Sequence, residues 1–213
     1  MKLFTLLFTV AVLLALPTAA QIVYENGPIN GNTDAWTINL GFDVSDTFTI
    51  STGTTTVTGM SFGAWLTPGD TLQSVGLSLT SDENGGTVYF QGQVPVTQSG
   101  CVLNSYSFDV CTEIGSFAPT MFNNGTYWVN LQNAIDSQGD PVYWDENSGV
   151  GCHSPGCPSQ AGPGGEGTMP SEAFSILGTT SSSTSNSVPE PSSLMLFATG
   201  VLGVGALVRR KLF

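Results

Sequence analysis

The stretch that decides the fold is residues 60–66, MSFGAWL, in which every second residue is apolar: Met60, Phe62, Ala64 and Leu66. A period of two predicts a strand with one buried face. Residues 74–80, SVGLSLT, and residues 125–132, GTYWVNLQ, show the same alternation. The threonine-rich residues 47–59 agree, because β-branched side chains fit a pleated sheet.

A further alternating run is residues 35–42, AWTINLGF, where the pattern predicts one shared face for Trp36, Ile38, Leu40 and Phe42. Turn signals such as TPGD, DENGG and QGDP separate the runs. The only helical feature that we expect among them is a single turn near residues 133–135. About eight or nine short strands predict an all-β, antiparallel, jelly-roll-like β-sandwich.

After residue 148 the composition turns to Gly, Pro and Ser, which predicts a long loop over residues 148–172. A last short strand, EAFSILG, follows and returns to the sandwich. We therefore place the β-sandwich domain at residues 21–178 and a flexible Ser/Thr-rich linker at residues 179–187.

The charge distribution excludes one class of partner. The chain has 16 acidic and four basic residues, and the basic ones are Lys2, Arg209, Arg210 and Lys211. No fixed positive charge lies between Lys2 and Arg209. Such a domain cannot neutralise phosphates, so we expect no nucleic-acid partner.

Residues 1–20 have the layout of a secretory signal peptide. Lys2 precedes an apolar run, and Pro17, Ala19 and Ala20 follow it. We expect a signal helix that signal peptidase removes after Ala20, leaving an exported domain.

Export to an oxidising compartment indicates disulfides for the four cysteines, although four cysteines allow three pairings. Neighbour pairing, Cys101 with Cys111 and Cys152 with Cys157, is the most economical arrangement. Each bridge would close a short loop and pin it locally.

The last residues, 188–213, have three physical parts. Val188, Pro189, Glu190 and Pro191 form an extended segment, because proline fixes φ and lacks an amide donor. Residues 192–208 are apolar or small and long enough to span a bilayer as a transmembrane helix. The basic stop in residues 209–213, Arg209, Arg210 and Lys211, favours the cytoplasmic side of the inner membrane and so places the domain beyond it.

This order of motif, apolar helix and basic stop resembles the PEP-CTERM sorting signal of Gram-negative bacteria. The resemblance implies cutting near residues 188–191 by an exosortase and release or re-anchoring at the cell surface. It also implies association with exopolysaccharide and the biofilm matrix. The alternative is a plain single-helix anchor. The segments NGPINGNTDAWTIN, GTYWVNLQNA and VYWDENSG also resemble other exported β-domains that carry this tail, a family without an activity to transfer.

Few residues suggest site chemistry. His153 stands between Cys152 and Cys157, but this spacing matches no established zinc site and favours the disulfide. Asp140, Asp145 and Glu146, together with Asp34, are acidic loop residues that could bind calcium. Two such carboxylates could also serve glycoside hydrolysis. The simplest interpretation is that they lie in solvated turns.

The aromatic residues suggest sugar binding. Neighbours in a strand point to opposite faces, so Tyr127 shares the face of Val129 and Leu131 while Trp128 points away. Val142 and Trp144 likewise share one face of their strand, so Tyr143 points to the opposite face. Trp128 and Tyr143 are therefore candidates for stacking on sugars, unless both are buried.

These observations predict a non-enzymatic cell-surface or exopolysaccharide-matrix protein without a required cofactor. The alternatives are a carbohydrate-binding module or adhesin, and a glycoside hydrolase-like enzyme.

Overall fold

The computed structural model describes residues 21–51, 53–147, 159–162 and 167–181. The predicted signal helix at residues 1–20 and transmembrane helix at residues 192–208 lie outside these ranges. Every regular element within them is a β-strand. The described residues accordingly include no helix long and apolar enough to cross a membrane.

Twelve strands form in the described residues. They are β1 (Gln21–Glu25), β2 (Ala35–Thr37), β3 (Asp43–Ile50), β4 (Thr54–Leu66), β5 (Leu72–Asp82), β6 (Gly85–Leu103), β7 (Asp109–Phe122), β8 (Gly125–Asp136), β9 (Tyr143–Asp145), β10 (Ser159–Gly162), β11 (Gly167–Met169) and β12 (Phe174–Ser181). All pairings between them are antiparallel.

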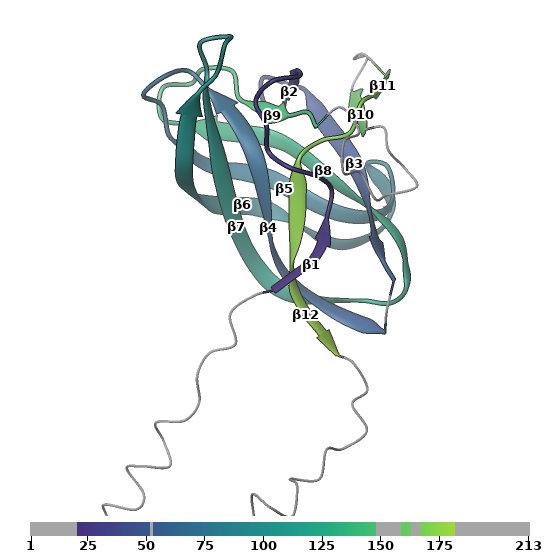
Figure 1. The fold of residues 1–213 in the computed structure, drawn as a ribbon. Coiled ribbons are helices and arrows are strands. Elements are labelled where there is room, and N and C mark those ends of the chain that lie inside the picture. The colour runs from purple at the N-terminus through teal and green to yellow at the C-terminus, as the bar shows by residue number, and fades with distance from the viewer. Residues whose placement is uncertain (1–20, 52, 148–158, 163–166, 182–213) are drawn as a thin grey trace, which may run out of the picture. The chain divides into compact units, whose positions relative to one another are not determined.

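The strands follow one continuous order, β1-β12-β4-β7-β6-β5-β8-β3-β10-β11, and β9 joins β2 to β4. The long strand β6 connects the two halves. Its residues 85–95 pair with β5, whereas its residues 96–103 pair with β7. The sheet therefore curls at β6, as Figure 1 shows. This confirms the all-β, antiparallel prediction, while the division into two stacked sheets stays a prediction.

The concave side of the curled sheet holds the core. The apolar alternation in the sequence predicted most of the core residues on β4, β5 and β8. Met60, Phe62, Ala64 and Leu66 of β4 are all buried. The predicted inward residues of β5 and β8 are buried too: Val75, Leu77, Leu79, Tyr127, Val129 and Leu131. Phe48 contacts both Phe122 and Tyr127 at ring-centroid distances of 5.7 and 5.6 Å.

The prediction for residues 35–42 was wrong beyond Ile38. Strand β2 ends at Thr37, and Leu40 and Phe42 are 65% and 47% exposed. The backbone turns here, because Leu40 and Gly41 have positive φ angles of 55° and 93°. The Phe42 amide also donates to the Asn39 carbonyl at 3.0 Å, which closes the turn.

Two smaller predictions also need correction. The expected helical turn at residues 133–135 is part of β8, where Asn133 has a φ of 48° and the pairing with β5 shifts register. Residues 148–172 are not entirely loop, because β10 and β11 form within them and β10 pairs with β3.

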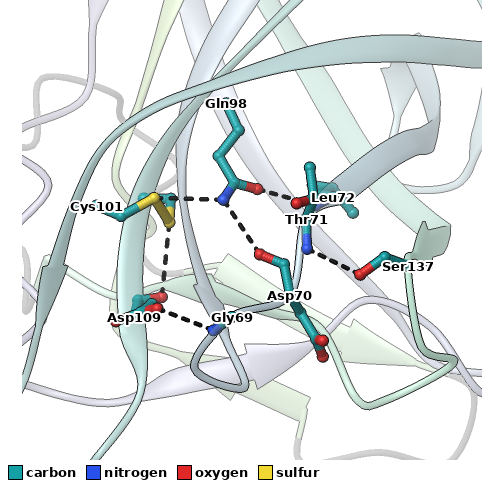
Figure 2. The surroundings of a disulfide bond; sticks show 9 residues. Gly69, Asp70, Thr71, Leu72, Gln98, Cys101, Asp109 and Ser137 are labelled. Carbon is teal, nitrogen blue, oxygen red and sulfur yellow. Dashed lines mark hydrogen bonds between the residues drawn. A yellow bond between two sulfur atoms is a disulfide. The ribbon is translucent and has the colours of Figure 1, made fainter.

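Cys101 and Cys111 form the predicted disulfide, which links β6 to β7 (Figure 2). Beside it, the Gln98 amide nitrogen donates to the Asp70 carbonyl at 3.2 Å, and the Gln98 amide oxygen accepts from the Leu72 amide at 2.9 Å. These contacts hold the β4–β5 turn against β6. Cys152, His153 and Cys157 lie outside the described residues.

Candidate functional site

An aromatic cleft opens where the β6–β7 turn meets β4 and β9. Its lining consists of Thr33, Asp34, Ala35, Trp65, Tyr106, Phe108 and Tyr143, and its volume is about 270 Å³. Four of these seven side chains are aromatic rings. We call this group of residues the aromatic cleft.

The rings pack in sequence across the cleft. Tyr106 stacks on Trp65 with centroids 5.5 Å apart and planes inclined by 24°. Phe108 meets Tyr143 edge to face at 5.4 Å. Trp65 is only 5% exposed while Tyr106 is 54% exposed, so Tyr106 presents the accessible ring surface. A large exposed ring backed by a second, fixed ring is a preorganised stacking surface.

Strand register and one asparagine position these rings. Trp65 of β4 lies opposite Tyr143 of β9 in the antiparallel ladder. Tyr106 and Phe108 lie in the β6–β7 turn. The backbone amides of both residues donate hydrogen bonds to the Asn104 side-chain oxygen at 3.0 Å. The Asn104 amide nitrogen donates to the Gly31 carbonyl at 3.2 Å. Asn104 therefore fixes the turn that carries two of the four rings.

Asp145 lies buried beneath the cleft. Its carboxylate accepts the Trp65 indole N–H at 2.6 Å and the backbone amides of Asn30 and Gly31 at 2.8 and 3.0 Å. Burial raises the pKa of Asp145, and these three donors oppose that effect. The carboxylate thus orients the Trp65 ring from behind.

Glu146 makes a similar contact one residue further on. It is buried, and its carboxylate accepts the Trp36 indole N–H at 3.3 Å. Burial raises the pKa of Glu146, and the nearby charge of Asp34 adds to the increase. The Glu146 amide donates to the Asp34 carbonyl at 3.0 Å, which fixes Asp34 at the edge of the cleft.

The predicted calcium ligands do not gather into one site. Asp145 and Glu146 are buried against indole N–H groups instead of lying in solvated turns. Asp140 lies near Asp70 and Asp136 instead, because the pKa of Asp70 is raised by burial first and then by Asp136 and Asp140. In the part of the chain that the structure describes, no group of three or more His, Cys, Asp or Glu side chains could hold a metal ion. Calcium binding itself stays a prediction.

The two predicted sugar-stacking residues have different surroundings. Both Trp128 and Tyr143 are partly buried. Tyr143 lines the aromatic cleft. Trp128 lies opposite Thr47 and Thr80 in the ladders. Thr80 borders a second, polar pocket of about 430 Å³ lined by Asp43, Ser78, Thr80, Asn84, Val88, Gln91, Gln132 and Gly162.

The alternation in the sequence selected Trp128 and Tyr143 as stacking candidates. It did not indicate that Trp65, Tyr106 and Phe108 line the cleft. Two signals were present. Trp65 is a large ring on the face of β4 opposite the core residues, and Tyr106 and Phe108 lie between the two bridged cysteines. Trp65 comes close to the β6–β7 turn only because β4 pairs with β7, and the sequence pattern does not reveal this pairing.

Two further carboxyl groups are buried away from the cleft. Asp46 accepts hydrogen bonds from the Ser171 hydroxyl at 2.6 Å, the Asn26 side chain at 2.9 Å and the Glu172 amide at 2.9 Å. Burial nevertheless raises the pKa of Asp46 to about 6. Glu113 on β7 is fully buried, and its oxygens find no hydrogen-bond partner among the described residues.

The fold and cleft define an all-β protein with one curled antiparallel sheet and an aromatic surface site. Residues 187–211 match the family model of the PEP-CTERM protein-sorting motif, which confirms the resemblance seen in the sequence. The chain therefore carries a sorting signal that implies export, processing by an exosortase and localisation at the cell surface or outside the cell. No curated protein and no solved structure matches the chain.

Proposed function

We propose that this protein is a non-enzymatic, glycan-binding component of the cell surface or exopolysaccharide matrix, and that the aromatic cleft binds the glycan. The observation that carries the proposal is the exposed Tyr106 ring stacked on the buried Trp65. An aromatic face held in place in this way can receive the apolar C–H face of a sugar ring with little loss of side-chain entropy. The volume of the cleft suits one sugar unit of a longer chain.

The arrangement of carboxylates favours binding over hydrolysis. A glycoside hydrolase needs two carboxyl groups that face each other across the scissile bond. Asp34 is the only acidic residue that lines the cleft in the described part of the chain. Asp145 and Glu146 lie nearby, but both are buried and accept from indole N–H groups.

The proposal includes a route to the surface. Signal peptidase would remove residues 1–20, and residues 192–208 would hold the protein transiently in the inner membrane with Arg209, Arg210 and Lys211 on the cytoplasmic side. An exosortase would then cut near residues 188–191.

The intact mass of the protein isolated from its own cells tests this route. We expect a species that starts near Gln21 and ends near Pro189 or Pro191. A species that still ends at Phe213 would show that the tail is a permanent anchor, and the matrix assignment would lose its support.

A matched pair of tyrosine variants tests glycan binding. We expect Tyr106→Ala to weaken binding of the native protein to neutral oligosaccharides by about tenfold, which corresponds to about 1.4 kcal/mol of stacking free energy. Tyr89→Ala is the control, because Tyr89 is also exposed but packs on Phe122 and Tyr127 and does not line the cleft. Equal loss in both variants, or no loss in either, would contradict the assignment of the cleft.

A further inference from the structure

We propose that the aromatic cleft prefers sugars that carry a protonated amine, such as glucosamine units, over neutral sugars and over uronic acids. This inference rests on the proposed glycan-binding function and names its ligand class. Three observations support it: the charge of the domain, the position of Asp34 and the packing of the rings.

The overall charge disfavours acidic glycans. No Lys or Arg occurs between residues 2 and 209, and all acidic residues except Glu190 fall before the tail. A surface of one charge sign attracts ligands of the opposite sign and repels those of its own. The domain thus offers no fixed cation to a uronate carboxylate.

Asp34 supplies a negative group at the cleft itself. The side chain is exposed, and its Oδ1 accepts the Ala35 amide at 2.9 Å. Ala35 also lines the cleft, and the Asp34 carbonyl is held by the Glu146 amide. The carboxylate is therefore anchored at the rim beside the rings, where an ammonium group could meet it.

The rings favour the same ligand. A cation near an aromatic face is attracted by the negative potential of the ring. Trp65 donates its indole N–H to the Asp145 carboxylate, which fixes the ring against which the exposed Tyr106 stacks. A glucosamine unit could then place its C–H face on Tyr106 and its ammonium toward Asp34 at the same time.

The test compares three oligosaccharide probes of equal length, measured by calorimetry on the native protein. They are a glucosamine oligomer, its fully N-acetylated counterpart and a galacturonate oligomer. Because one exposed charge pair and one cation–π contact act together, we expect the glucosamine oligomer to bind about tenfold more tightly than the acetylated one. The galacturonate oligomer should bind most weakly.

Two charge variants separate a local contact from the general field of an acidic protein. Asparagine keeps the oxygen that accepts from Ala35, so Asp34→Asn removes the charge alone. We expect Asp34→Asn to remove most of the preference for the glucosamine probe, because only the cation–π contact then remains, and to leave binding of the acetylated probe unchanged. Asp82→Asn is the control, since Asp82 is exposed on β5 and does not line the cleft.

The outcomes distinguish the two proposals. If the acetylated probe binds and depends on Tyr106 but the amine brings no gain, the preference is refuted and glycan binding stands. An equal loss in Asp34→Asn and Asp82→Asn would also refute the local preference. If none of the three probes binds, both proposals fall.

Discussion

Glu113 provides a direct test of how this fold buries charge. The side chain lies on β7, is 0% exposed, and has no hydrogen-bond partner for either oxygen among the described residues. Burial raises its pKa from 4.5 to about 7. The test variant is Glu113→Gln, which keeps the shape of the side chain and removes its ability to ionise.

The raised pKa of Glu113 determines how the free energy of unfolding changes with pH. The folded state binds the proton more tightly than the unfolded state, so the free energy of unfolding is highest below pH 4.5. It falls as the pH rises through 7, where the folded protein must carry the buried charge. A difference of about 2.5 pH units at 1.36 kcal/mol per unit gives a loss of about 3 kcal/mol.

The assay is urea unfolding of the wild type and of Glu113→Gln at a series of pH values from 4 to 8. We expect the stability of the variant relative to the wild type to increase by about 3 kcal/mol across this range. The cost of burying the amide does not depend on pH, so it cancels in the comparison. Glu25→Gln, at an exposed position of β1, controls for the loss of one negative charge. Parallel pH profiles for the wild type and Glu113→Gln would show that the Glu113 carboxyl group does not have a raised pKa in the folded protein.

Three further predictions concern stability. Asp46→Ala should lower the free energy of unfolding by about 2–4 kcal/mol in urea titrations, because it leaves several buried donors without their acceptor; a loss below 0.5 kcal/mol would contradict this. Replacing Cys101 and Cys111 together by serine should cost about 3 kcal/mol, since the bridge closes a short loop of ten residues, and an unchanged melting temperature would oppose it. Gly63→Ala should destabilise the protein and weaken glycan binding, because the new alanine Cβ would lie 2.7 Å from the Asp145 Cβ beneath the cleft. Unaltered glycan binding would show that the cleft does not depend on the present position of Asp145.

The sequence predicted the elements whose alternation is set by burial alone. Met60 and Phe62 on β4 and Tyr127 on β8 face the core as their period indicates, and the Cys101–Cys111 pair forms as proximity suggests. Alternation failed at residues 39–42, because a turn with positive φ angles interrupts the run and the apolar Leu40 and Phe42 remain exposed.

The aromatic cleft was only partly predictable for a related reason. Tyr143 was identified because strand geometry separates it from the buried Trp144. Its partners Trp65, Tyr106 and Phe108 come from another strand and another turn. Their meeting depends on long-range pairing of β4 with β7 and β9, and the local pattern of one chain does not encode that register.

The absence of Lys and Arg between residues 2 and 209 limits the partners that a buried carboxylate can find in this fold. A buried carboxylate ordinarily requires a cation or several hydrogen-bond donors. In this fold the donors that Asp145 and Glu146 find are indole N–H groups of Trp65 and Trp36, joined at Asp145 by backbone amides. These two carboxyl groups are buried behind the rings, and the negative charge at the rim of the cleft is that of the exposed Asp34. A bound ligand can then supply the positive charge that no Lys or Arg of the domain provides, and this is the basis of the proposed preference of the cleft for an amine-bearing sugar over a uronate.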